Sequence, residues 1–339
     1  MNIEVKNIRR SFRSTKKEEG WRGTFGLLLR PKYQEHEALK DVSFSIEPGS
    51  FNGLIGANGA GKTTLLKILS GLIPPSSGSA RVLGYDPFQR SLDFRRKIAL
   101  VMGQKAQLWW DLPARDAFDL LRAIYEIPNK VYQERLHTLT ELLDVQRLLG
   151  TQIRRLSLGE RMKMELIGAI IHWPSVIFLD EPTIGLDVLA AHKLREFLKV
   201  FNHREKATII LTSHNMDDIE RLCSRVLILR SGALIYDGHP QGLIQEGERI
   251  LRVRFINSPS IEDLQKATGL PAQLIQLGDS EAEDSDGTRP ILFSIKQDQI
   301  VSVLQSVINR FPILDMGIEE QSLEKVIQRI YSEEKAGPA

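Results

Sequence analysis

The sequence predicts an α/β protein whose main domain has a mostly parallel sheet covered by helices. Three observations lead to this prediction. Short apolar segments alternate with segments of helical periodicity, which is the pattern of parallel strands joined by helices. A glycine-rich turn at residues 56–64 lies between one such strand and a helix. A change in composition after Gly242 marks a second, smaller segment, for which we expect an α+β fold.

Length and composition limit the kinds of protein this chain can be. Its 339 residues are 42% hydrophobic, which is enough for two domains with apolar cores. The 45 Lys and Arg nearly balance the 43 Asp and Glu, so no basic field favours binding to nucleic acid. Cys223 is the only cysteine, which excludes an internal disulfide and suggests a small core residue. Without a signal peptide or an apolar run of membrane-spanning length, we expect a cytoplasmic protein.

The N-terminal region is expected to hold strands at residues 2–8 and 38–46, separated by an insertion at residues 14–37. The insertion combines lysines and arginines with aromatic and leucine residues. Such a composition suits membrane headgroups or a partner helix. A solvated loop with a small apolar cluster explains it equally well. The role of the insertion is therefore open at this point.

The rest of the main domain, taken as residues 1–243, is expected to alternate strands with helices. Residues 114–149 have helical spacing and belong to a helical insert at about residues 105–165. A further helix is expected at residues 161–171. Strands are expected at residues 51–55, 80–83, 98–102, 176–179, 208–212, 226–229 and 233–236.

The C-terminal segment, residues 244–339, is predicted to be an accessory domain with the β-α-β-β-α-β order of a ferredoxin-like fold. Its strands are expected at residues 250–256, 272–277, 290–296 and 313–319, and its helices at residues 260–268 and 298–310. The acidic run at residues 279–286 is best interpreted as a solvated loop. A last helix is expected at residues 322–331.

The glycine-rich turn has the features of a phosphate-binding loop. Three glycines let the backbone curl with its amides pointing inward at a helix N-terminus, where an anionic polyphosphate can bind. Lys62 can reach the β- and γ-phosphates, and the Thr63 hydroxyl can ligate Mg²⁺. A turn without a ligand is the alternative that the flanking strand and helix disfavour. The loop consists of Gly56, Ala57, Asn58, Gly59, Ala60, Gly61, Lys62, Thr63 and Thr64.

Two acidic residues, Asp180 and Glu181, follow the apolar strand expected at residues 176–179. Carboxylate oxygens are favoured ligands of hard cations, so we expect Asp180 to hold Mg²⁺ directly or through water. Glu181 is then expected to face the γ-phosphate, orient the attacking water and accept its proton. The alternative is that both acids only cap the turn at Pro182.

With these motifs in place, residues 1–243 resemble the ATP-binding subunit of an ABC transporter. The resemblance rests on five motifs in order: the phosphate loop, Gln104, the signature segment 156–160, the acidic segment 176–181, and His214. It implies a P-loop NTPase core with an antiparallel β subdomain and a helical insert. ATP and Mg²⁺ are the implied ligands.

The resemblance also assigns roles to residues outside the phosphate loop. It implies that Gln104 contacts Mg²⁺ and the attacking water, with an amide that offers both an acceptor and a donor. His214 is implied to donate a hydrogen bond to the γ-phosphate and so to sense it. Phe12 matches the position of the aromatic residue that stacks on adenine better than Tyr33, the alternative.

A second set of residues is implied to act across a dimer. Ser157 and Gly159 precede a helix and offer another group of amides to phosphate. In the family, this segment covers the ATP that is bound by the opposite subunit, and Asp187 resembles the residue that couples the two sites. Glu160 belongs to the same segment; here Leu158 and Glu160 replace the commoner Gly and Gln. A second ATPase subunit, in a homodimer, is therefore expected.

The residues after Gln104 and the variant signature resemble one branch of ABC exporters, in which a separate ATPase drives small multispanning permeases. The resemblance implies an ATPase on the inner face of the cell membrane, with permease subunits and no nucleic acid as partners. A soluble ABC-type ATPase acting on ribosomes or DNA is disfavoured, because the chain lacks a second cassette or a long coiled-coil arm. A regulatory module with an inactive site is disfavoured because Lys62, Asp180, Glu181 and His214 are all present.

Trp109 and Trp110 lie on the loop that follows Gln104. Large aromatic residues are unusual on loops unless they are buried against something. We expect them to help form the surface that contacts the permease. The alternative is that both rings pack on the helix expected at residues 114–127.

Overall fold

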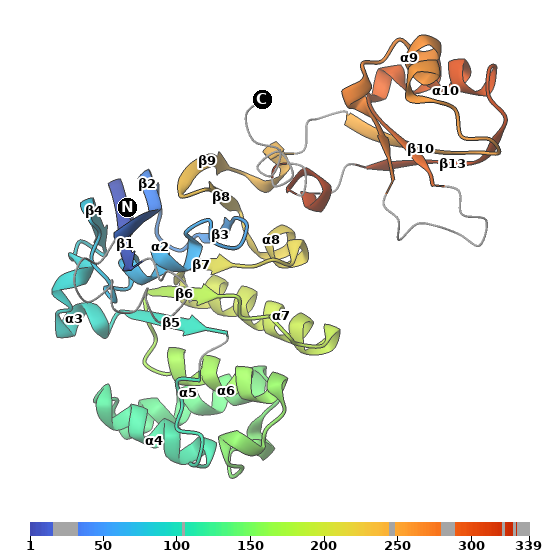
Figure 1. Ribbon diagram of the computed structural model, residues 1–339. Helices are drawn as coiled ribbons and strands as arrows, with labels where there is room; N and C mark the ends of the chain where they lie inside the picture. Colours follow the sequence, from blue (N-terminus) through green and yellow to red (C-terminus); the bar gives the residue numbers. More distant parts are fainter. Residues whose placement is uncertain are drawn as a thin grey trace, which may run out of the picture. The chain divides into compact units, whose positions relative to one another are not determined.

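The computed structural model describes residues 1–15, 33–103, 106–243, 248–278, 289–320, 323–327 and 330 (Figure 1). The chain forms two compact units, residues 1–240 and residues 241–339. Each unit has sheets and a hydrophobic core of its own. In the described part of the chain, no helix has both the length and the apolar character required to cross a lipid bilayer.

A six-stranded mixed sheet forms the centre of the first unit. Its strands are parallel except for the last, which closes a hairpin with its neighbour. Every residue of the central strand is buried, as expected for a parallel strand that is covered on both faces. The order across the sheet is β5 (Ile98–Met102), β6 (Val176–Asp180), β7 (Thr208–Thr212), β3 (Phe51–Ile55), β8 (Arg225–Arg230) and β9 (Ala233–Gly238).

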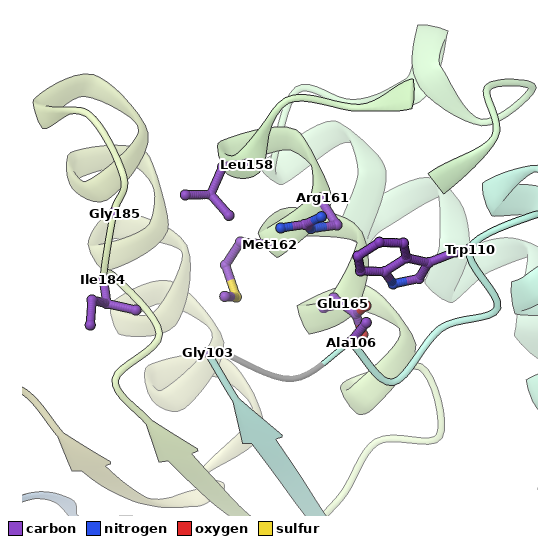
Figure 2. Close-up of a pocket in the computed structure, with 9 residues that line it drawn as sticks. All are labelled: Gly103, Ala106, Trp110, Leu158, Arg161, Met162, Glu165, Ile184 and Gly185. Carbon is purple, nitrogen blue, oxygen red and sulfur yellow. The ribbon is translucent and has the colours of Figure 1, made fainter. Parts of the chain in front are cut away.

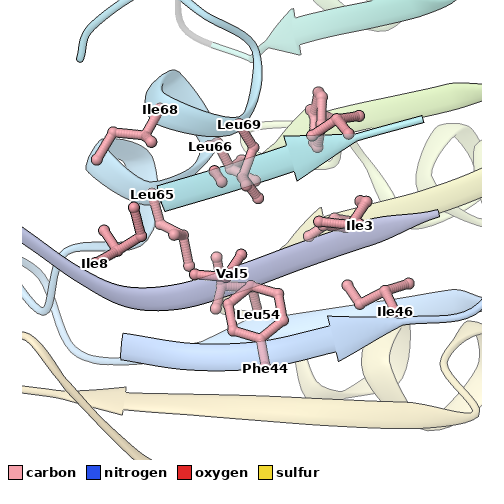
Figure 3. Close-up of a cluster of buried hydrophobic side chains, with 14 of the residues drawn as sticks. Ile3, Val5, Ile8, Phe44, Ile46, Leu54, Leu65, Leu66, Ile68 and Leu69 are labelled. Atoms are coloured by element: carbon pink, nitrogen blue, oxygen red, sulfur yellow. The ribbon is translucent and has the colours of Figure 1, made fainter. Parts of the chain in front are cut away.

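A three-stranded antiparallel sheet packs against this core, in the order β2 (Tyr33–Ile46), β1 (Ile3–Thr15) and β4 (Ser77–Val82). Its inward side chains meet α2 (Lys62–Leu69), the helix that follows the phosphate loop. Figure 3 shows Val5, Ile8 and Phe44 near Leu65 of that helix. The antiparallel sheet is therefore built onto the element that carries the candidate site.

The strands β1 and β2 are longer than the sequence indicates. They pair from Ile3 with Ile46 as far as Thr15 with Tyr33, so the expectation that residues 14–37 form an insertion is wrong at both ends. In this part of the hairpin, the side chains of residues 9–13 and 35–37 are exposed or half-buried, so no apolar alternation marks it as a strand. Backbone pairing extends it instead. The remainder, residues 16–32, lies outside the described residues.

Helices lie beside the sheet and in the expected insert. The insert contains α4 (Ala114–Ile124), α5 (Asn129–Leu142) and α6 (Leu158–Ile170), which pack together, with α6 against β5. The helix α6 begins three residues before the expected start because Ser157 caps it. The other helices of this unit are α3 (Leu92–Arg95), α7 (Val188–Glu205) and α8 (Met216–Leu222).

The second unit has a four-stranded antiparallel sheet that packs with two helices, α9 and α10, and its described residues 323–327 are also helical, within the last helix expected at residues 322–331. Buried side chains of both helices, such as Leu264 and Val303, pack with sheet residues that include Phe255 and Phe293. The sheet order is β11, β12, β10, β13. In chain order, the elements are β10 (Glu248–Phe255), α9 (Ile261–Thr268), β11 (Ile275–Leu277), β12 (Ile291–Lys296), α10 (Ile300–Ile308) and β13 (Ile313–Glu320). The acidic run at residues 279–286 lies outside the described residues.

Candidate functional site

The phosphate loop connects β3 to α2 and has a backbone that requires glycine. Gly61 has a φ of +105°, and a Cβ added there would lie 2.5 Å from the Ala38 carbonyl oxygen. A Cβ on Gly56 would lie 2.5 Å from the carbonyl oxygen of Leu229. Side chains at these positions would push the loop away from β2 and β8. The loop leads directly into the first turn of α2, whose amides have no partner within the helix and can meet an anion.

Lys62 is the first residue of α2, and its side chain folds back over the loop. Only 6% of the residue is exposed. Its Nζ donates hydrogen bonds to the carbonyl oxygens of Gly56, at 2.5 Å, and Ala57, at 3.2 Å. Burial lowers the pKa of this ammonium, while the nearby charges of Glu181 and Asp180 act in the opposite direction. A cation is thereby held at the centre of a group of oxygen and amide atoms.

Asp180 ends β6 with both carboxylate oxygens engaged. The Thr63 hydroxyl donates to Oδ2 at 2.8 Å, and the Thr212 hydroxyl donates to Oδ1 at 2.7 Å. Such oxygen donors suit Mg²⁺, which commonly takes one or two carboxylates together with substrate phosphates and water. Among the described residues, no group of three or more His, Cys, Asp or Glu could hold a metal alone.

Glu181 adopts a left-handed backbone conformation, with a φ of +55°. Such a conformation costs free energy for a residue with a side chain and persists only where the surroundings hold it. Its amide donates to the backbone carbonyl and the side-chain oxygen of Thr212, at 3.1 and 3.0 Å. On the other side, the Gly103 backbone packs so closely on the Glu181 carbonyl that a Cβ there would overlap it. The backbone of Glu181 is therefore fixed by β5 and β7.

The side chains of Glu181 and His214 meet. The distance between Glu181 Oε1 and His214 Nε2 is 2.9 Å. The carboxylate side chain is 20% exposed and the imidazole 43% exposed, so both remain reachable from solvent. The structure thus brings together, at the carboxyl ends of β6 and β7, two residues that are 33 positions apart in the sequence.

A cavity of about 240 Å³ lies over the phosphate loop. Phe12 of β1 lines it, beside His36, which is its partner across the β1–β2 pair. The guanidinium carbon of Arg10 lies 4.6 Å from the centre of the Phe12 ring. Its other lining residues are Ala38, Ala57, Asn58, Gly59, Gly61, Lys62, Thr63, Thr64 and Glu181.

The four residues expected to act across a dimer do not line this cavity. Ser157 and Glu160 form a capping box at the start of α6, in which the Glu160 carboxylate accepts hydrogen bonds from the Ser157 amide, at 3.0 Å, and hydroxyl, at 2.9 Å. These bonds lower the pKa of Glu160. Gly159 lies between them. Asp187 caps α7 by accepting a hydrogen bond from the Ala190 amide at 2.9 Å.

Gln104 and Lys105 lie outside the described residues, but the segment after them is held by α6. The buried carboxylate of Glu165 accepts hydrogen bonds from the amides of Gln107, at 3.0 Å, and Leu108, at 3.1 Å. Burial raises the pKa of this group, and the two amide bonds oppose the shift. Glu165 thus fixes the chain directly after Gln104 to the helix that carries the signature segment.

A second cavity, of about 280 Å³, opens beside this contact. Figure 2 shows Trp110 and Arg161 on one side of it and Leu158 and Ile184 on the other. The Arg161 guanidinium lies 5.0 Å from the Trp110 ring. Trp109 and Trp110 are 45% and 46% exposed, so neither ring is buried in the helical insert.

Sequence reasoning did not identify three groups at the site. His36 lies on a strand segment that carries no strand signal. Thr212 ends β7. A hydroxyl residue at the carboxyl end of a parallel strand is a sequence signal from which Thr212 could have been predicted as a site residue. Asp218 is fully buried on α8 and binds the hydroxyls of Thr183 and Ser213. Nothing in the local sequence separates Asp218 from the ordinary acidic residues of a first helical turn.

Comparison with known proteins finds relatives of this chain. The family model described as "ABC transporter" matches residues 39–184. The ABC transporter ATP-binding protein NatA of Bacillus subtilis is 32% identical over 220 residues, which cover 65% of this chain and 89% of NatA. Nod factor export ATP-binding protein I of Neorhizobium galegae is 28% identical over 304 residues, covering 89% of this chain and 83% of that protein.

Solved structures show the same fold. One described as the ATP-binding subunit of an ABC transporter has a TM-score of 0.59 and 26% identity, covering 72% of this chain and 92% of that one. An ATP-binding cassette solved in a post-hydrolysis state with ADP and Pi has a TM-score of 0.58 and 22% identity, covering 70% and 98%, and this likeness concerns the fold alone. The expected fold class, a P-loop core with an antiparallel β subdomain, a helical insert and a small α+β unit, is confirmed.

Proposed function

Because the chain belongs to the family of ATP-binding subunits of ABC transporters and is an ABC-type ATPase, we propose that it hydrolyses ATP at a dimer interface to drive export through a separate permease. The observation that carries the proposal is the contact between Glu181 and His214, 2.9 Å apart at the edge of the phosphate-loop cavity. The names of related exporter ATPases support the direction of transport.

In the proposed hydrolysis, Glu181 orients the attacking water and accepts its proton. His214 contacts Glu181 Oε1 in this structure, and it donates a hydrogen bond to the γ-phosphate when ATP is present. Lys62 neutralises the charge of the β- and γ-phosphates. Thr63 and Asp180 would hold Mg²⁺ together with Gln104. Once bound, this ion would neutralise charge on the phosphates.

We assign the adenine contact to Phe12 and its neighbours. Phe12 is 37% exposed and lines the same cavity as the phosphate loop. Arg10 covers part of this ring, and His36 stands next to it across the strand pair. A purine stacked on Phe12 would keep the triphosphate directed toward Lys62.

The positions of four residues, Ser157, Gly159, Glu160 and Asp187, support the trans roles that we propose for them. They lie at the N-termini of α6 and α7, exposed or half-buried, and they do not line the cavity over the phosphate loop. A second copy of the chain would bring these helix ends over the bound nucleotide, where amides favour anions. A homodimer is the arrangement we propose, positioned against permease subunits on the inner face of the cell membrane.

The decisive variant is Glu181→Gln, which keeps the shape of the side chain and removes the proton acceptor. We expect steady-state hydrolysis to fall by about 10²- to 10⁴-fold. ATP binding should remain, and a dimer with trapped nucleotide should accumulate in gel filtration. Glu141→Gln, an exposed carboxylate of α5, is the control and should behave like the wild type. Normal turnover by Glu181→Gln would remove Glu181 from the mechanism.

A further inference from the structure

A buried carboxylate ties together the two loops that carry Glu181 and His214. Asp218, on α8, is fully buried. Its Oδ2 accepts hydrogen bonds from the hydroxyls of Thr183 and Ser213, both at 2.6 Å. Thr183 follows Glu181 by two residues, and Ser213 immediately precedes His214. One oxygen atom therefore joins the chain on either side of the contact between Glu181 and His214.

The same carboxylate is anchored to the body of the protein. Its Oδ1 accepts a hydrogen bond from Arg195 Nη1 at 2.8 Å, and Arg195 lies on α7 with a side chain that is 7% exposed. Ser213 in turn accepts a hydrogen bond from the Asn215 amide at 3.0 Å. Charge-assisted bonds of this kind, in a buried setting, hold their partners more firmly than exposed ones. The two loops are thereby fixed to α7 and α8 as well as to each other.

The hydrogen bonds of Asp218 restrain the chain near Glu181, whose backbone conformation requires such restraint. Its left-handed backbone has to be held by its surroundings; Thr212 binds its amide and the Gly103 backbone packs on its carbonyl, but neither restrains the chain that follows Glu181. The Thr183 hydroxyl restrains the chain after the buried Pro182. The Ser213 hydroxyl restrains the chain that leads to His214.

We propose that Asp218 is a positioning residue for ATP hydrolysis, which sets the relative placement of Glu181 and His214 through Thr183 and Ser213. It touches neither the nucleotide cavity nor the reacting atoms. The inference rests on the roles proposed above for Glu181 and His214. Its consequence is that the hydroxyls of Thr183 and Ser213 contribute to kcat without taking part in ATP binding.

The test leaves the buried pair of Asp218 and Arg195 intact, because removing one partner of such a pair leaves an uncompensated charge and can unfold the protein. Thr183→Val and Ser213→Ala each delete one hydroxyl instead. Misplacement of catalytic groups by about 1 Å can cost about 10²-fold in rate. We expect each variant to lower kcat by about 10- to 100-fold, with KM for ATP and the melting temperature close to wild type.

Two further variants separate positioning from general packing. Thr183→Ser restores the hydroxyl without the methyl group and should recover most of the kcat that Thr183→Val loses. Thr140→Val removes a buried hydroxyl on α5 that bonds to the Leu136 carbonyl, far along the chain from the site, and should leave kcat unchanged. Full-length protein is used throughout, with single-turnover and steady-state ATP hydrolysis as readouts.

The inference is overturned if Thr183→Val keeps wild-type kcat, or if Thr183→Ser loses as much kcat as Thr183→Val. It is also overturned if the kcat loss comes with an equal loss of ATP affinity and of thermal stability, which would indicate a structural role. These outcomes are distinct from failure of the proposed function. If Glu181→Gln is inactive while Thr183→Val is fully active, only the role of Asp218 is wrong.

Discussion

At the scale of single residues, Lys62 shows how the loop prepares a charge for its ligand. The ammonium is buried, its pKa is lowered, and loop carbonyl oxygens accept its hydrogen bonds. A buried cation whose hydrogen bonds go to neutral carbonyls gains much from a multiply charged anion nearby. We therefore expect Lys62 to exchange its hydrogen bonds to the loop carbonyls for hydrogen bonds to phosphate when ATP binds.

We therefore expect Lys62→Ala to raise the Kd for ATP by about 10- to 100-fold, since a hydrogen bond to a charged group contributes about 1.5–3 kcal/mol. Isothermal titration calorimetry would measure it. Lys67→Ala, in the last turn of the same helix, is the matched control and should bind ATP normally. Unchanged affinity in Lys62→Ala would contradict the phosphate-loop assignment.

At the scale of elements, α6 connects three parts of the proposed mechanism. Its first turn carries Ser157 and Glu160, its middle holds the segment after Gln104 through Glu165, and Arg161 covers the ring of Trp110. Trp110 lines the second cavity, and nearly half of Trp110 and of its neighbour Trp109 is exposed. A shift of the segment after Gln104 would therefore move the surface on which these two tryptophan rings lie.

On this basis, Trp109→Ala and Trp110→Ala should keep basal ATP hydrolysis and lose association with the cognate permease, measured by pull-down from membranes. Large aromatic anchors commonly contribute more than about 2 kcal/mol to binding at interfaces. Phe88→Ala is a matched control, because Phe88 is 45% exposed and has the Arg90 guanidinium 5.1 Å from its ring. If neither tryptophan variant reduces association, the coupling surface lies elsewhere.

At the scale of the whole molecule, the chain has two compact units, and all the residues that line the phosphate-loop cavity belong to the first. The second unit encloses a core of its own, with Phe255, Phe293 and Leu264 among its buried residues. We propose that this unit is an accessory domain that tunes the ATPase without contacting ATP.

A chain that ends after Leu243 should accordingly bind ATP with a Kd within about twofold of wild type, since no cavity residue is removed. Dimer stability or stimulation by the permease should change, as followed by analytical ultracentrifugation and by ATPase assays with reconstituted permease. A folded, monodisperse truncation that no longer binds ATP would show that the domain division is wrong.

The sequence alone was sufficient for the fold class and for the ATPase assignment, because both depend on local patterns. Glycine spacing in residues 56–61, the buried run before Asp180 and the alternation of strands with helices are each encoded within short windows. The antiparallel subdomain and the helical insert were also predicted from short sequence segments of this kind. The specific site roles, including that of Gln104, stay predictions.

Only the tertiary structure decided which distant residues meet. The exposed extension of β1 and β2 brings His36 beside Phe12 through backbone pairing, which leaves no hydrophobic pattern in the sequence. Thr212 reaches Asp180 because β6 and β7 are neighbours in the sheet, and the strand order is not written in either segment. Asp218 joins Thr183 to Ser213 only once α8 packs against α7. These contacts join residues from different elements, so their existence depends on packing rather than on local sequence.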